Sequence, residues 1–92
     1  MPASMAKMEL DDSLLEPFDT DDLTVPLIRL TSEPEPPDAQ LMLGNAEYKY
    51  DRSYPIKGHS AVMPGYLREQ LAAGKKPLLI ERPERFYLYF AA

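Results

Sequence analysis

The clearest pattern of apolar and polar positions lies over residues 78–90, which run LLIERPERFYLYF. Two apolar runs flank a polar turn that contains a proline, and this arrangement predicts a β-hairpin. Side chains alternate between the two faces of a strand, which places Phe86, Leu88 and Phe90 on one face and Tyr87 and Tyr89 on the other. A strand with two apolar faces is either covered on both sides or half exposed to a partner.

A single helix is predicted over Pro64–Ala73. Proline suits the first helical position, and Gly74 suits the left-handed residue just past a helix end. Met63, Leu67 and Leu71 are spaced four residues apart, which produces a narrow apolar stripe along the helix. We therefore expect this helix to pack on one face of a sheet.

A tight hairpin is predicted over residues 40–50, which run QLMLGNAEYKY. Gly44 and Asn45 separate two short strand-like runs, and glycine at the first central position favours a type II′ turn. Tyr48 and Tyr50 share the face opposite the charged side chains of the second run. Because charged groups prefer water, both tyrosines should point toward the core.

The remaining segments of the body carry proline. Thr24–Thr31 has the aliphatic and β-branched content of a strand, but Pro26 has no amide proton, which predicts an edge strand. Residues 32–39 contain three prolines and predict an extended loop. Residues 52–63 show no clear period and are expected to form a loop.

Residues 1–23 are expected to be an acidic, disordered arm, because acids and prolines interrupt the apolar positions. Leu14, Leu15 and Phe18 lie among these acids. Such a composition is typical of segments that order on a partner's groove. The alternative is that the three side chains fold back over the chain's own sheet.

The predicted fold is therefore α+β, with residues 24–92 forming one small domain. We expect a mostly antiparallel sheet of four or five short strands with one helix. The rival architecture is a small SH3-like barrel with an inserted helix.

Composition narrows the function classes. The chain has no cysteine, which removes disulfides and thiolate metal sites. Residues 1–40 hold ten acidic and two basic side chains, whereas residues 41–92 hold five acidic and eight basic ones. This asymmetry indicates an acidic arm on a mildly basic body. No apolar run is long enough to span a bilayer, and we expect a cytoplasmic protein without membrane insertion.

Candidate chemistry is sparse. His59 and Ser60 are neighbours, but a serine nucleophile needs its base nearby in space, and no further catalytic group accompanies them. Lys57, His59 and Ser60 precede a predicted helix start, where free amides attract anions, so they form a weak candidate anion site. We expect no enzyme activity, no metal and no cofactor.

Binding to another macromolecule is the remaining class. Basic and tyrosine side chains of the second half could form a platform for single-stranded nucleic acid. Nucleic acid is not expected, however, because the net charge of the chain is −5.

The sequence therefore favours a small non-enzymatic interaction or regulatory protein, such as an accessory subunit, that binds another protein or itself as a homodimer. Tyrosine and arginine are enriched in protein interfaces. The predicted contact residues are Tyr87, Tyr89, Arg82, Arg85, Leu14, Leu15 and Phe18.

Overall fold

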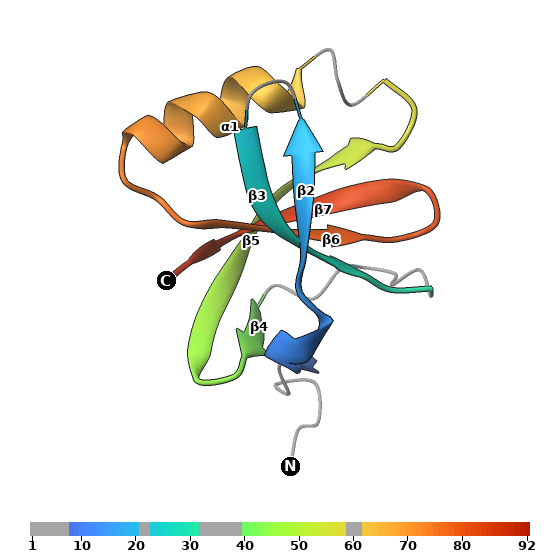
Figure 1. The fold of residues 1–92 in the computed structure, drawn as a ribbon, viewed down its shortest axis with the longest axis vertical. Helices are drawn as coiled ribbons and strands as arrows, with labels where there is room; N and C mark the ends of the chain where they lie inside the picture. The colour runs from blue at the N-terminus through green and yellow to red at the C-terminus, as the bar shows by residue number, and fades with distance from the viewer. Residues whose placement is uncertain (1–7, 21–22, 32–39, 59–61) are drawn as a thin grey trace.

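The computed structural model describes residues 8–20, 23–31, 40–58 and 62–92, which form a curled seven-stranded sheet with one α-helix (Figure 1). The strand order is β1-β4-β5-β7-β6-β3-β2. The elements are β1 (Met8–Leu10), the 3-10 turn η2 (Asp12–Leu14), β2 (Glu16–Thr20), β3 (Leu23–Arg29), β4 (Gln40–Leu43), β5 (Ala46–Pro55), α1 (Met63–Ala72), β6 (Pro77–Glu81) and β7 (Arg85–Ala91).

The predicted sheet of four or five strands is wrong, and so is the rival SH3-like barrel. The sheet has seven strands and is mixed, because β1 pairs with β4 and β3 pairs with β6 in parallel. Both parallel pairs join segments that are distant in the chain, and no local sequence pattern indicates such a pairing. The α+β class with one helix is confirmed.

The two outermost strands of the sheet are consecutive in the chain. Five residues, 11–15, connect the end of β1 to the start of β2. A connection of this length reaches at most about 20 Å, so the sheet must curl until its two edges approach each other. We call the gap between these edges the seam. Residues 11–15, including η2, cross it.

Strand β3 is the second strand from the edge, so the prediction of an edge strand at Thr24–Thr31 is wrong. Strand β2 covers its outer side, with Pro17 opposite Pro26. On the inner side the pairing with β6 begins at Leu27. Pro26 has no N–H to donate, and the parallel ladder begins one residue after it.

Strand β5 is longer than predicted and ends at Pro55, so the first residues of the expected loop over 52–63 belong to the sheet. Its pairing with β7 is interrupted between Tyr50 and Arg52, which marks a bulge or similar irregularity. A bulge bends a strand and increases its twist. The first part of β5 pairs with β4, and the pairing with β7 runs from Tyr48 to Pro55.

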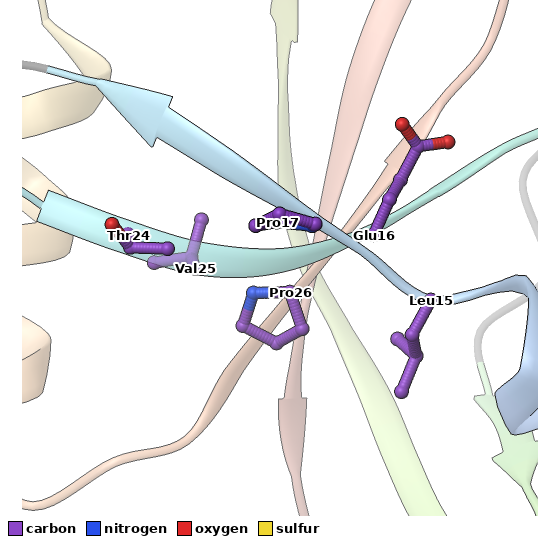
Figure 2. A pocket seen from close by; sticks show the side chains of 6 residues that line it. All are labelled: Leu15, Glu16, Pro17, Thr24, Val25 and Pro26. Carbon is purple, nitrogen blue, oxygen red and sulfur yellow. The ribbon is translucent and has the colours of Figure 1, made fainter.

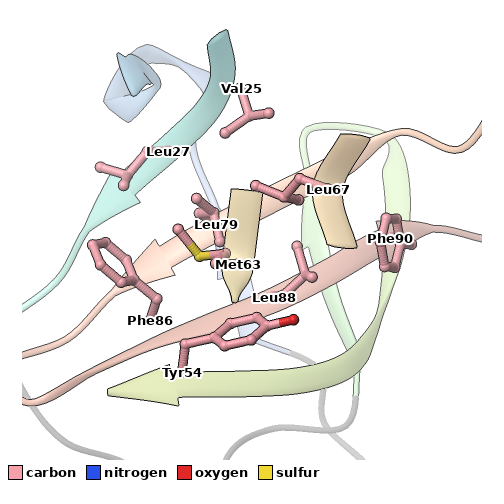
Figure 3. Packing of buried hydrophobic residues seen from close by; sticks show 9 residues of the cluster. All are labelled: Val25, Leu27, Tyr54, Met63, Leu67, Leu79, Phe86, Leu88 and Phe90. Atoms are coloured by element: carbon pink, nitrogen blue, oxygen red, sulfur yellow. The ribbon is translucent and has the colours of Figure 1, made fainter. Parts of the chain in front are cut away.

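Two apolar clusters cover the two faces of the central strands. Figure 3 shows the first, in which Met63 and Leu67 of α1 lie over Leu79 and Leu88 of the sheet. The second cluster fills the opposite face and contains Ile28, Leu41, Leu43, Leu78, Ile80, Tyr87 and Tyr89, with Leu10, Leu30, Tyr48 and Tyr50 packed against it. Strand β7 therefore has core on both faces, which explains its continuous apolar sequence.

The predicted positions of the helix and of the hairpin turn at Gly44 are confirmed, but Leu71 of the predicted apolar stripe is 36% exposed. The helix predicted over Pro64–Ala73 spans Met63–Ala72. Gly74 has φ +85°, and the Lys75 and Gly74 amides donate to the Gln70 and Leu71 carbonyls, which is a Schellman motif. Gly44 has φ +61° between β4 and β5, as the predicted hairpin requires.

Candidate functional site

The four contact residues predicted on the last hairpin are largely enclosed. Tyr89 is 2% exposed and Tyr87 is 7% exposed, and both belong to the second cluster. Arg82 is 6% exposed. Arg85 is half-buried, and its Nε donates to Ser53 Oγ at 2.9 Å. Their role in partner binding stays a prediction, and the surface described below is built from other residues.

The three apolar residues predicted in the arm fall into two groups. Phe18 is half-buried, and its ring centroid lies 5.3 Å from that of Phe86, so it packs on the first cluster. Leu14 is 48% exposed and Leu15 is 37% exposed, although both are large aliphatic side chains. Phe18 thus packs β2 against the core, whereas Leu14 and Leu15 remain on the surface at the seam.

The weak anion site is only partly described. Lys57 is exposed and lines a groove of about 380 Å³ with Pro55, Ile56, Pro83 and Glu84. His59 and Ser60 lie outside the described residues.

The described part of the chain contains no group of three or more His, Asp or Glu side chains that could hold a metal ion. None of its helices has the length and apolar character needed to cross a bilayer. The cytoplasmic location stays a prediction.

An apolar groove borders the seam. It has a volume of about 360 Å³ and is lined by Leu15, Glu16, Pro17, Thr24, Val25 and Pro26 (Figure 2). Leu15 and Pro26 extend to the same side of the β2–β3 ribbon in this view. We call the exposed Leu14, Leu15, Pro17 and Pro26 the seam surface.

The two prolines shape the free edge of β2. Facing residues of an antiparallel pair alternate between hydrogen-bonded and non-hydrogen-bonded positions. Pro17 and Pro26 face each other and neither has an N–H, so they occupy a non-hydrogen-bonded position. The backbone of Pro17 therefore points to the outer edge without a donor. Such an edge resists the addition of another strand, so we expect a ligand here to bind mainly through the side chains.

Five acidic side chains belong to the two strands and the turn that border the seam. They are Glu9, Asp11, Asp12, Glu16 and Asp19, which we call the acidic rim. The Asp11 carboxylate accepts the Ser13 N–H at 3.0 Å and caps η2. This bond from the backbone lowers the pKa of Asp11, because it stabilises the charged carboxylate. The cap therefore fixes both the turn that exposes the leucines and a negative charge beside them.

A second cluster of polar contacts joins α1 to the bulge of β5 and was not predicted. Tyr66 Oη donates to Asp51 Oδ2 at 2.7 Å, and Arg52 Nε donates to the same oxygen at 2.9 Å. The Arg52 guanidinium carbon lies 3.8 Å from the Tyr66 ring centroid. Asp51 lies at the bulge of β5, 15 positions from Tyr66 in the sequence.

These contacts bear on the nucleic-acid alternative. Base stacking needs an open aromatic face. Arg52 lies over the Tyr66 ring, and Tyr54, Tyr87 and Tyr89 are buried. No observation among the described residues favours a stacking platform, so we propose no second function.

The contact between Tyr66 and Asp51 predicts a pH dependence of stability. The pKa of Tyr66 is raised, first by burial and then by the hydrogen bond to Asp51. Above the ordinary pKa of 10.0 the unfolded chain releases this proton while the folded protein retains it. The stabilisation is therefore complete below pH 10 and is lost as the pH rises toward the raised pKa.

The free energy of unfolding, measured by urea titration from about pH 9 to pH 11, checks this prediction. Tyr66→Phe should show a shallower decline than the wild type over this range. An equal decline in the two proteins would contradict it.

Comparison with protein-family models, with curated proteins and with solved structures found no match to this chain. The seam surface and its surroundings are therefore the features of this protein that indicate a function. Sequence reasoning found Leu14 and Leu15 but missed Pro17 and Pro26 as lining residues. The spacing of these two prolines, nine positions apart around a possible turn, was the available signal.

Proposed function

We propose that this chain is a small non-enzymatic protein that binds another protein through the seam surface, as an accessory subunit or a regulator. One observation carries the proposal: two neighbouring leucines, Leu14 and Leu15, are 48% and 37% exposed beside an apolar groove. Exposed apolar side chains that gather at a groove with a polar border are typical of interaction surfaces.

The structural setting supports this proposal. Leu14 and Leu15 lie on the short connection that crosses the seam, between two strands that are held in the sheet. The backbone is fixed there by the Asp11 cap and by the bond from the Leu15 amide to the Asp12 carbonyl at 3.1 Å. A preorganised apolar surface loses little conformational entropy when it binds.

The test compares the leucine pair at the seam with a single leucine on α1, in the native cell extract. Leu14→Ser with Leu15→Ser should lower the yield of a co-purified partner about tenfold or more, because both contact side chains lose their apolar area. Leu71→Ser is the matched control, since Leu71 is 36% exposed on α1. It should leave the yield unchanged.

A photo-crosslinking residue placed at position 14 or at position 71 locates the contact directly. The proposal expects an adduct from position 14 and none from position 71. Equal yields in the pull-down, together with adducts from position 71 alone, would place the contact elsewhere on the protein.

A further inference from the structure

The charge around the seam is strongly unbalanced. The described part of residues 8–31 contains the five acids of the acidic rim and one base, Arg29. Arg29 Nε lies 3.2 Å from Glu81 Oε1, and a terminal Arg29 nitrogen lies 3.8 Å from Glu16 Oε1. Arg29 is therefore shared between two carboxylates and does little to offset the rest of the acidic rim.

Three of the acids gather on the other side of η2 from the apolar groove. Glu9, Asp11 and Asp12 line a second groove of about 500 Å³, together with Leu10, Met42 and Gly44. None of the three forms an ion pair with a described residue. The turn Asp12–Leu14 thus separates an acidic groove beside β1 from an apolar groove beside β2.

This arrangement disfavours several occupants. Nucleic acid and anionic membrane surfaces carry negative charge, which the acidic rim repels. A symmetric dimer through the seam would place one acidic rim against another, because a two-fold interface presents the same patch on both copies. An added strand would meet the edge of β2 at Pro17, where no N–H is available.

We propose that the partner presents a cationic segment with an aliphatic anchor. The aliphatic side chain enters the groove of Leu15, Pro17 and Pro26, and flanking Lys or Arg side chains reach Glu9, Asp11 and Asp12. Complementary charge across such a surface accelerates association and selects the partner. This inference rests on the proposed function, since it names the chemistry that the same surface recognises.

Short synthetic peptides of equal length test the inference with the full-length protein. The first peptide carries Lys and Arg on both sides of a Leu-Leu pair. The second replaces the leucines by serine, and the third replaces Lys and Arg by glutamine. Binding is followed by amide chemical shifts in two-dimensional NMR spectra. The first peptide should shift the amides of Leu14, Leu15 and Thr24, and both others should bind more weakly.

Charge variants sharpen the test. Glu9→Gln with Asp12→Asn should weaken binding of the first peptide about two- to thirtyfold, as expected for the loss of two exposed charge pairs. Raising the salt concentration should weaken binding of the wild type more than that of this variant. Glu69→Gln, on the exposed side of α1, removes one acid away from the seam and should leave binding unchanged.

The outcomes separate the two proposals. If the glutamine peptide binds the seam as tightly as the cationic one, the charge inference is wrong while docking on the seam surface stands. If the cationic peptide shifts no seam amide, or shifts α1 instead, the inference is overturned. In that case the proposed function is decided by whether a photo-crosslinking residue at position 14 forms an adduct with a partner. If the protein dimerises and Leu14→Ser abolishes the dimer, the partner at the seam is a second copy of this chain and not a cationic segment.

Discussion

Replacing Leu88 by alanine and replacing Tyr89 by serine are expected to destabilise the protein by similar, large amounts. The two residues are neighbours on β7 and point to opposite faces, Leu88 into the cluster under α1 and Tyr89 into the second cluster. Leu88 is fully buried, and such large-to-small changes cost about 2–5 kcal/mol. Truncation of a buried aromatic costs a similar amount, about 3–5 kcal/mol.

Urea unfolding measures both losses. With a slope of about 1–3 kcal/mol per molar urea for a small protein, each midpoint should fall by about 1 M or more. Leu71→Ala, at a half-exposed position of α1, is the control and should stay within about 0.5 kcal/mol of the wild type. A Tyr89→Ser protein as stable as the control would mean that the second face is open, and the hairpin would again become a candidate contact surface.

Deleting residues 1–22 is expected to abolish the cooperative folded monomer. The deletion removes β1, η2 and β2, including the contact between Phe18 and Phe86. It also uncovers β3 and β4, whose buried residues include Val25, Leu27 and Leu41. Unpaired strands with apolar side chains associate with other chains. The fragment should therefore aggregate, or unfold without a sharp transition.

Size-exclusion chromatography and thermal unfolding check this result. A protein that lacks only residues 1–7 retains all seven strands and is the matched control. Phe18→Ala in the full chain should cost about 1–3 kcal/mol, less than a core aromatic, because the ring is half-buried. If residues 23–92 form a stable monomer, the N-terminal segment is the independent acidic arm that its composition predicts.

Local signals in the sequence were sufficient for the helix and for both hairpins. Gly44 and Gly74 each adopt a positive φ at a chain reversal, which glycine permits at low cost. The stripe of Met63 and Leu67 faces the sheet because helical geometry places residues four apart on one side. Such features depend on near neighbours in the chain, so a single sequence contains the information.

The strands at the two edges of the sheet, and the curl of the sheet, could not be predicted from local sequence patterns. The segment Glu16–Thr20 has five residues, of which two are acidic and one is proline, and its composition is that of a disordered region. It forms a strand because it pairs with β3 and because its one aromatic side chain, Phe18, packs against Phe86. The curl follows from the short connection between β1 and β2. This connection constrains the sheet only because β1 and β2 pair at its opposite edges, and local sequence does not indicate that pairing.

The candidate site shows the same division. The sequence placed Leu14 and Leu15 among acids, and it split the charge between an acidic first part and a mildly basic second part. Whether the two leucines cover the sheet or face outward depends on where the chain crosses the seam. That crossing is decided by two ladders, one with β4 and one with β3.

The sequence by itself determined the two apolar faces of β7, because side-chain alternation is a property of any extended chain. Only the tertiary structure decided what covers each face. The helix covers Leu88, and the curl of the sheet brings Leu41 and Leu43 of β4 into the cluster that buries Tyr89. Burial depends on contacts between distant segments, and a sequence pattern indicates that a side chain needs cover without indicating which segment supplies it.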